Sequence, residues 1–113
     1  MASIPVVVTA PATVASVNVA RPTNNLGTPV GAGILDYLVI APASAEPLFL
    51  SIWAGVDVAY AAGTRRDVIP IKDSQNIVPI GQSYPTGCTI RISTGNDGTG
   101  NPAAAKICSF SWV

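Results

Sequence analysis

Histidine is absent from this chain of 113 residues, and Asp, Glu, Lys and Arg together make up only 11% of it. Soluble domains usually carry about 25% charged residues. A zinc site needs four Cys, His or carboxylate ligands at characteristic spacing, and the two thiols Cys88 and Cys108, 20 residues apart and without histidine, do not supply that pattern. The six basic residues are scattered apart from Arg65 and Arg66, so the clustered cations that neutralise nucleic-acid phosphates are missing. We expect no metal or cofactor, and no direct binding to nucleic acid.

Long apolar runs are missing as well. The longest candidate, residues 33–58, is interrupted by two aspartates, a glutamate and two prolines, which argues against a membrane span. Residues 1–20 are apolar, but no positive charge precedes Arg21, and Val alternates with Thr, Ser and Asn as in a strand. We read this stretch as mature protein without a signal peptide, made and kept without export.

What the chain does have is a period of two along most of its length, between clusters of Pro, Gly and Asn. This pattern predicts eight or nine short strands, and therefore an all-β fold. We expect residues 1–113 to form one antiparallel β-sandwich of jelly-roll type, with an extended N-terminal segment at about 1–11. The expected strands are 3–9, 13–20, 34–41 (central because nearly all apolar), 48–54, 56–61, 67–71, 76–80, 88–93 and 106–113.

Two of these strands repeat almost the same phrase, VIPI at 68–71 and IVPI at 77–80. Proline cannot donate a ladder hydrogen bond, so Pro70 and Pro79 predict edge strands, which we expect to form a hairpin guarded against further pairing. An alternative follows from apolar residues on both faces, which a neighbouring subunit would have to cover. We therefore predict a subunit interface here, made by Val68, Ile69, Pro70, Ile71, Ile77, Val78, Pro79 and Ile80.

The last two strands are expected to form a closing hairpin. Alternation places Cys88 with Ile90 and Ile92, and Cys108 with Phe110 and Trp112, on inward faces. A disulfide between the two cysteines is sterically conceivable. In a reducing compartment, however, two reduced thiols in the core are favoured.

No motif for catalysis stands out, and we expect no enzymatic activity. Asp36, Asp57 and Asp67 have no spacing that pairs them for acid/base work. The loop NDGTGN at 96–101 resembles the opening of a calcium loop, yet Asp97 is its only carboxylate, so a flexible hairpin loop is favoured. Trp53, Tyr60, Tyr84 and Trp112 are the aromatic residues considered for a carbohydrate or peptide groove; we expect Trp112 in the core and Tyr84 exposed in a turn.

The stretch IPIKDSQNIVPIGQSYPTGCTIRISTGNDG resembles small bacteriophage virion proteins in style, with V-x-I-P-I-x strands, a P-x-G turn and a strand ending in T-G. The resemblance covers roughly residues 48–113. It implies a capsid decoration (cement) or head-tail accessory protein that oligomerises, binds the major capsid or other virion proteins, and resides in the virion. The alternative that we keep is a small carbohydrate- or receptor-binding module, lectin-like or at a tail tip.

Overall fold

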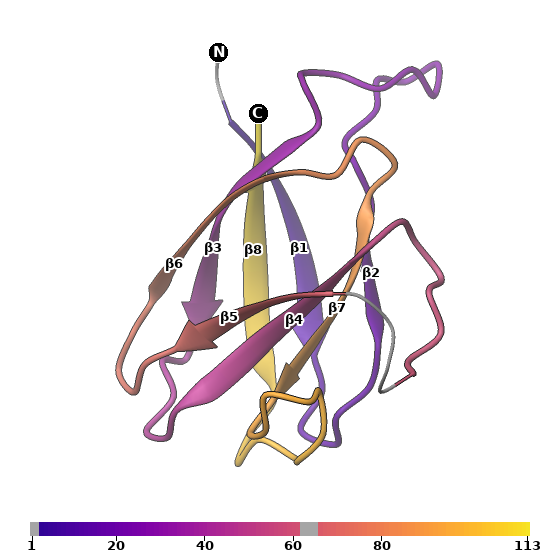
Figure 1. The fold of residues 1–113 in the computed structure, drawn as a ribbon. Coiled ribbons are helices and arrows are strands. Elements are labelled where there is room, and N and C mark those ends of the chain that lie inside the picture. Colours follow the sequence, from indigo (N-terminus) through magenta and orange to yellow (C-terminus); the bar gives the residue numbers. More distant parts are fainter. Residues whose placement is uncertain (1–2, 62–65) are drawn as a thin grey trace.

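The computed structural model describes residues 3–61 and 66–113, and these fold as eight strands in two four-stranded antiparallel sheets packed as a sandwich (Figure 1). The predicted all-β sandwich is confirmed. No helix long and apolar enough to cross a membrane occurs in these two ranges. The strands are β1 (Ile4–Ala10), β2 (Val17–Val19), β3 (Ile34–Ala41), β4 (Leu48–Ala54), β5 (Asp67–Ile71), β6 (Ile77–Ser83), β7 (Cys88–Ser93) and β8 (Lys106–Trp112).

The strand order identifies the sandwich as a jelly roll. One sheet has the order β1-β8-β3-β6 and the other the order β2-β7-β4-β5. The chain therefore passes from one sheet to the other at every connection except that between β4 and β5. Such a double-sheet arrangement of eight strands is the jelly-roll topology that the pattern of short strands predicts. β3 lies between β8 and β6, so the prediction that this nearly all-apolar strand is central is confirmed.

Two predicted hairpins are wrong. β7 pairs with β2 and β4, whereas β8 pairs with β1 and β3, so the expected closing hairpin does not form. β5 and β6 are likewise neighbours along the chain but belong to opposite sheets. In both cases the connection arches over the end of the sandwich, because in this jelly roll every pair of successive strands except β4 and β5 is divided between the two sheets.

Two other strand predictions need correction. The expected strand at 56–61 is absent, and this segment lies as irregular chain over the β2-β7-β4-β5 sheet. Of the expected strand at 13–20, only Val17–Val19 forms β2, because Val14 donates its backbone N–H to the Asn101 side chain at 3.0 Å and not to a strand.

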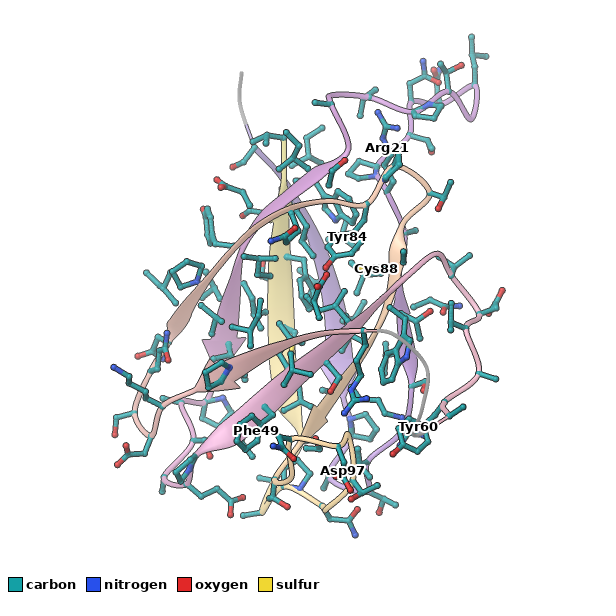
Figure 2. The ribbon with its side chains drawn as sticks, viewed as in Figure 1. Arg21, Phe49, Tyr60, Tyr84, Cys88 and Asp97 are labelled. Carbon is teal, nitrogen blue, oxygen red and sulfur yellow. The ribbon has the colours of Figure 1, made fainter. Side chains whose placement is uncertain are left out.

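The core lies between the sheets and takes one face of each strand. Phe110 and Trp112 of β8 are buried there, as predicted, together with Cys88 and Cys108. Both cysteines are free, so the disulfide alternative is wrong and the reduced-thiol prediction is confirmed. Tyr84, expected to be exposed, is buried at 3% exposure, because the turn that carries it folds inward to the core (Figure 2).

Each of the four edge strands has a feature that discourages pairing with another chain. β1, β5 and β6 contain Pro5, Pro70 and Pro79, and β2 is only three residues long. The prediction that the two proline-bearing strands lie at sheet edges is confirmed. Proline removes a ladder donor and a short strand offers few, so growth of either sheet by strand addition is disfavoured.

The buried thiols predict a loss of stability at alkaline pH. Burial raises the pKa of Cys88 from 9.0 to about 12 and that of Cys108 from 9.0 to about 11. Above pH 9 the unfolded chain releases these protons while the folded chain keeps them. The free energy of unfolding should therefore fall between pH 9 and pH 12, by up to about 1.4 kcal/mol per pH unit for each thiol.

Denaturant unfolding from pH 7 to pH 11 measures how steeply the free energy of unfolding falls with pH. A Cys88→Ala variant is the control, and its free energy of unfolding should fall less steeply. Burial and the bond to Asp67 raise the pKa of Tyr84 as well, so the slope steepens above pH 10. Thiol reagents should label both cysteines only in denaturant. Labelling of the native protein as fast as the unfolded one would contradict the core placement.

Candidate functional site

The eight predicted interface residues divide between the core and the surface. In β5, Ile71 is buried and Ile69 packs against the core, while Val68 and Pro70 face outward. In β6, Val78 is buried and Ile80 packs against the core, while Ile77 and Pro79 face outward. Because the two strands belong to opposite sheets, their outward residues look away from each other. The subunit contact predicted from these residues stays a prediction.

Ile77 and Pro79 extend a larger surface, the outer side of the β1-β8-β3-β6 sheet. Strand register arranges eleven outward residues there in three rows. We call this surface the uncharged face; its rows are Thr9, Ile107 and Ala41, then Val7, Ser109, Val39 and Ile77, then Pro5, Ser111, Tyr37 and Pro79. None of these side chains carries a charge. Asp36, the extra residue at a bulge in β3, is the nearest carboxylate along that strand.

The uncharged face exposes large apolar side chains. Val7 is 62% exposed, Ile77 59%, Ile107 57% and Val39 37%. These four are half of the large hydrophobic residues exposed in the described ranges. Single exposed apolar residues are ordinary, but a contiguous apolar patch on a monomer typically marks an interaction surface.

The outer side of the opposite sheet is covered by the protein's own chain. Trp53 of β4 is 2% exposed although it points away from the core. Tyr60 stacks edge-on against it with ring centroids 5.9 Å apart, and the Arg91 guanidinium lies 4.1 Å from the centre of the Tyr60 ring. The Arg66 guanidinium lies 5.8 Å from the centre of the Trp53 ring. We call Trp53, Tyr60, Arg66 and Arg91 the arginine–aromatic clasp.

The 94–101 loop is fastened to this clasp. The Tyr60 hydroxyl donates to the backbone oxygen of Asp97 at 2.7 Å, and Arg91 Nη1 donates to the Gly98 oxygen at 3.2 Å (Figure 2). Asp97 Oδ1 accepts from both the hydroxyl and the backbone N–H of Thr99. These bonds hold the pKa of Asp97 below its usual range, with the Thr99 hydroxyl the main cause. The only carboxylate of the calcium-like stretch is thus engaged within its own loop.

A pocket of about 360 Å³ lies between β4, the start of β5 and the end of β6. Its polar lining includes Asp67, whose Oδ2 accepts a 2.6 Å hydrogen bond from the Tyr84 hydroxyl. Burial, followed by this bond, raises the pKa of Tyr84 well above its usual value, so the phenol stays protonated. The lining residues are Ile52, Ala54, Arg66, Asp67, Gln82, Ser83 and Tyr84.

The structure also places the residues considered for chemistry. Asp57 Oδ1 accepts from the Asn18 amide at 2.6 Å, Asp67 is bonded to Tyr84, and Asp36 lies at the β3 bulge. Within residues 3–61 and 66–113, no three Cys, Asp or Glu residues gather as metal ligands would. Comparisons of the chain with protein-family models, curated proteins and solved structures found no match.

The uncharged face was missed at the sequence level because it joins strands far apart in the chain. The alternation of each strand shows which residues share a side, as in Ile107, Ser109 and Ser111 of β8. It does not show that Val7 of β1 lies beside Ser109, which depends on strand pairing. The one sequence signal of this face was local: β1 and β3 carry apolar residues on both sides, so one apolar side of each had to lie outside the core.

The clasp predicts an unusual requirement for glycine at position 98. Gly98 has φ +87°, and an added Cβ would lie 3.0 Å from Cε2 of Tyr60. Gly27 has a similar φ of +78° with nothing within 4 Å. Gly98→Ala should lower the free energy of unfolding by about 2–3 kcal/mol and Gly27→Ala by only about 1 kcal/mol. Denaturant melts of both variants give the difference, and equal losses would show that the ring does not restrain the loop.

Proposed function

We propose that this protein is a non-enzymatic structural protein of a virus particle, most simply a capsid decoration protein that oligomerises and stabilises the particle by adhesion. The uncharged face carries the proposal. Val7, Val39, Ile77 and Ile107 gain free energy on leaving water, at roughly 25 cal/mol per Å². A protein that acts alone in solution has no evident use for such a patch.

The ordering cost of such a contact is low. Val, Pro, Ala, Thr and Ser lose little side-chain freedom when a partner covers them, and they stand on a sheet that is already rigid. The edge strands add a further constraint. Because proline and short length discourage strand addition there, a partner is more readily bound by the outer face of the sheet than by its edge. Jelly-roll domains are common in viral capsid proteins, which supports the viral setting as an analogy of fold.

A carbohydrate-binding module is the second candidate, since lectin domains share this architecture. The pocket at Asp67 favours it through its size and its carboxylate, amide and hydroxyl groups. The aromatic rings that would stack on a sugar argue against it, because Trp53, Tyr84 and Trp112 are each buried at 3% exposure or less.

The decoration role predicts that virus particles from the source of this sequence contain the chain in many copies. Quantitative mass spectrometry of purified particles measures the copy number. Particles stripped of the chain should disassemble at a lower temperature and regain their stability when the purified protein is added back. An Ile107→Asp variant should restore less stability, whereas Leu26→Asp, at an 84% exposed residue off this face, should restore it fully. Absence of the chain from the particles would refute the proposal.

The carbohydrate alternative predicts a separate result. If the pocket binds a sugar, a glycan array should show binding that Asp67→Asn weakens at least about tenfold, because the carboxylate would accept the sugar hydroxyl bonds. Thr86→Ala, in the exposed turn before β7, is the matched control. A protein that binds no glycan on the array removes this alternative.

A further inference from the structure

We infer that the uncharged face is covered by the same face of a second copy of this chain, in a two-fold dimer whose axis passes near Ser109. The inference rests on the proposed function in one respect, namely that the uncharged face is a surface for adhesion. It adds the identity of the partner that covers this face, which the decoration role leaves open.

Charge is the first argument for a second copy. In a two-fold contact each residue near the axis meets itself or a close neighbour, so any charged group there faces its own like charge. The eleven positions of the uncharged face include no Asp, Glu, Lys or Arg. This face can therefore meet itself without repulsion and without burying an unpaired ion.

The clasped side of the molecule cannot do the same. Arg66 and Arg91 lie over the outer side of the β2-β7-β4-β5 sheet, so two copies meeting there would bring guanidinium groups together. Loops also cover that side, where Tyr60 is bonded to the 94–101 loop. Among residues 3–61 and 66–113, the uncharged face is the one outer sheet surface that is both bare and compatible with a copy of itself.

The relief of the face is the second argument. On β8, Ser109 and Ser111 are small, and their neighbours across the strands are larger: Val7 and Val39 flank Ser109, and Pro5 and Tyr37 flank Ser111. Along Ser109 and Ser111, β8 is therefore a shallow trough between two ridges, and it rises again at Ile107, which is 57% exposed. Sheets packed face to face lie about 10 Å apart and interdigitate. If the axis passes beside Ser109, between β8 and β3, the β3 ridge of one copy enters the β8 trough of the other.

The available area fits a moderate dimer. Strands lie about 4.8 Å apart and outward residues about 6.8 Å apart along each strand, so the three rows cover roughly 350 Å² of sheet plane. Side-chain relief enlarges the accessible area beyond this plane. Two copies would remove on the order of 1,000 Å² from water, which is near the lower limit for a specific interface. We expect a dissociation constant of roughly micromolar order.

Light scattering across a concentration series tests the dimer. The mass should rise from one chain to two near micromolar concentration. Ile107→Asp places two carboxylates in the contact and should raise the dissociation constant at least about tenfold. Leu26→Asp, off the face, should leave it unchanged. Circular dichroism checks that both variants keep a β spectrum. A wild-type monomer at every concentration, or a dimer that Ile107→Asp leaves unaltered, would overturn the inference.

Cysteine cross-linking tests the position of the axis. Ser109→Cys should be cross-linked into a dimer by a short bismaleimide, because the two new thiols would lie close together on either side of the axis, while sheets about 10 Å apart are too distant for a direct disulfide. Cys88 and Cys108 are fully buried and should not react. Thr86→Cys, exposed in the turn before β7, is the control and should cross-link no faster than by random collision. Equal rates for the two variants would refute an axis near Ser109.

The two proposals fail separately. A face-to-face dimer that is absent from virus particles would remove the decoration role and keep the dimer. A chain present in particles but monomeric and not cross-linked at position 109 would remove the dimer and keep the role.

Discussion

The whole molecule depends on one constraint: each strand has an apolar side that forms the core, and all eight must bury that side in one space between two sheets. Phe110 and Trp112 of β8 meet this demand from one sheet, and Ile90 and Ile92 of β7 from the other. The alternation along each strand leaves the opposite side outside. What happens to those outer sides, one covered and one bare, is what distinguishes this jelly roll.

The extent of most strands was readable from the sequence, apart from those predicted at 13–20 and 56–61, whereas their partners were not. The bounds of β3, β4, β5 and β7 agree with the periodicity, because alternation and turn residues are local signals. Pairing was misjudged wherever neighbours along the chain were assumed to be neighbours in a sheet. The 94–105 loop could by its sequence connect a hairpin or two strands in opposite sheets. Which connection forms depends on how all eight strands pack their apolar sides together.

The candidate site shows the same division. The proline rule placed Pro70 and Pro79 at edges, since a missing N–H is a property of the residue itself. The uncharged face is a property of register: Val7, Ser109 and Val39 become one row only after β1 and β3 have both paired with β8. Tyr84 was misplaced for a related reason, because its turn residues indicated exposure while the core needed its ring.

The pairing of β1 with β8 has a consequence for how the protein is made. Ile4 lies opposite Trp112, so β1 must wait until β8, the last of the eight strands to be synthesised, before it gains a neighbour in its sheet. Such long-range closure is slow, and folds dominated by it take milliseconds to seconds. During synthesis β1 is therefore an unpaired apolar segment in a crowded cell. Pro5 then serves the nascent chain as much as the finished one, because it limits pairing with other chains before the proper partner exists.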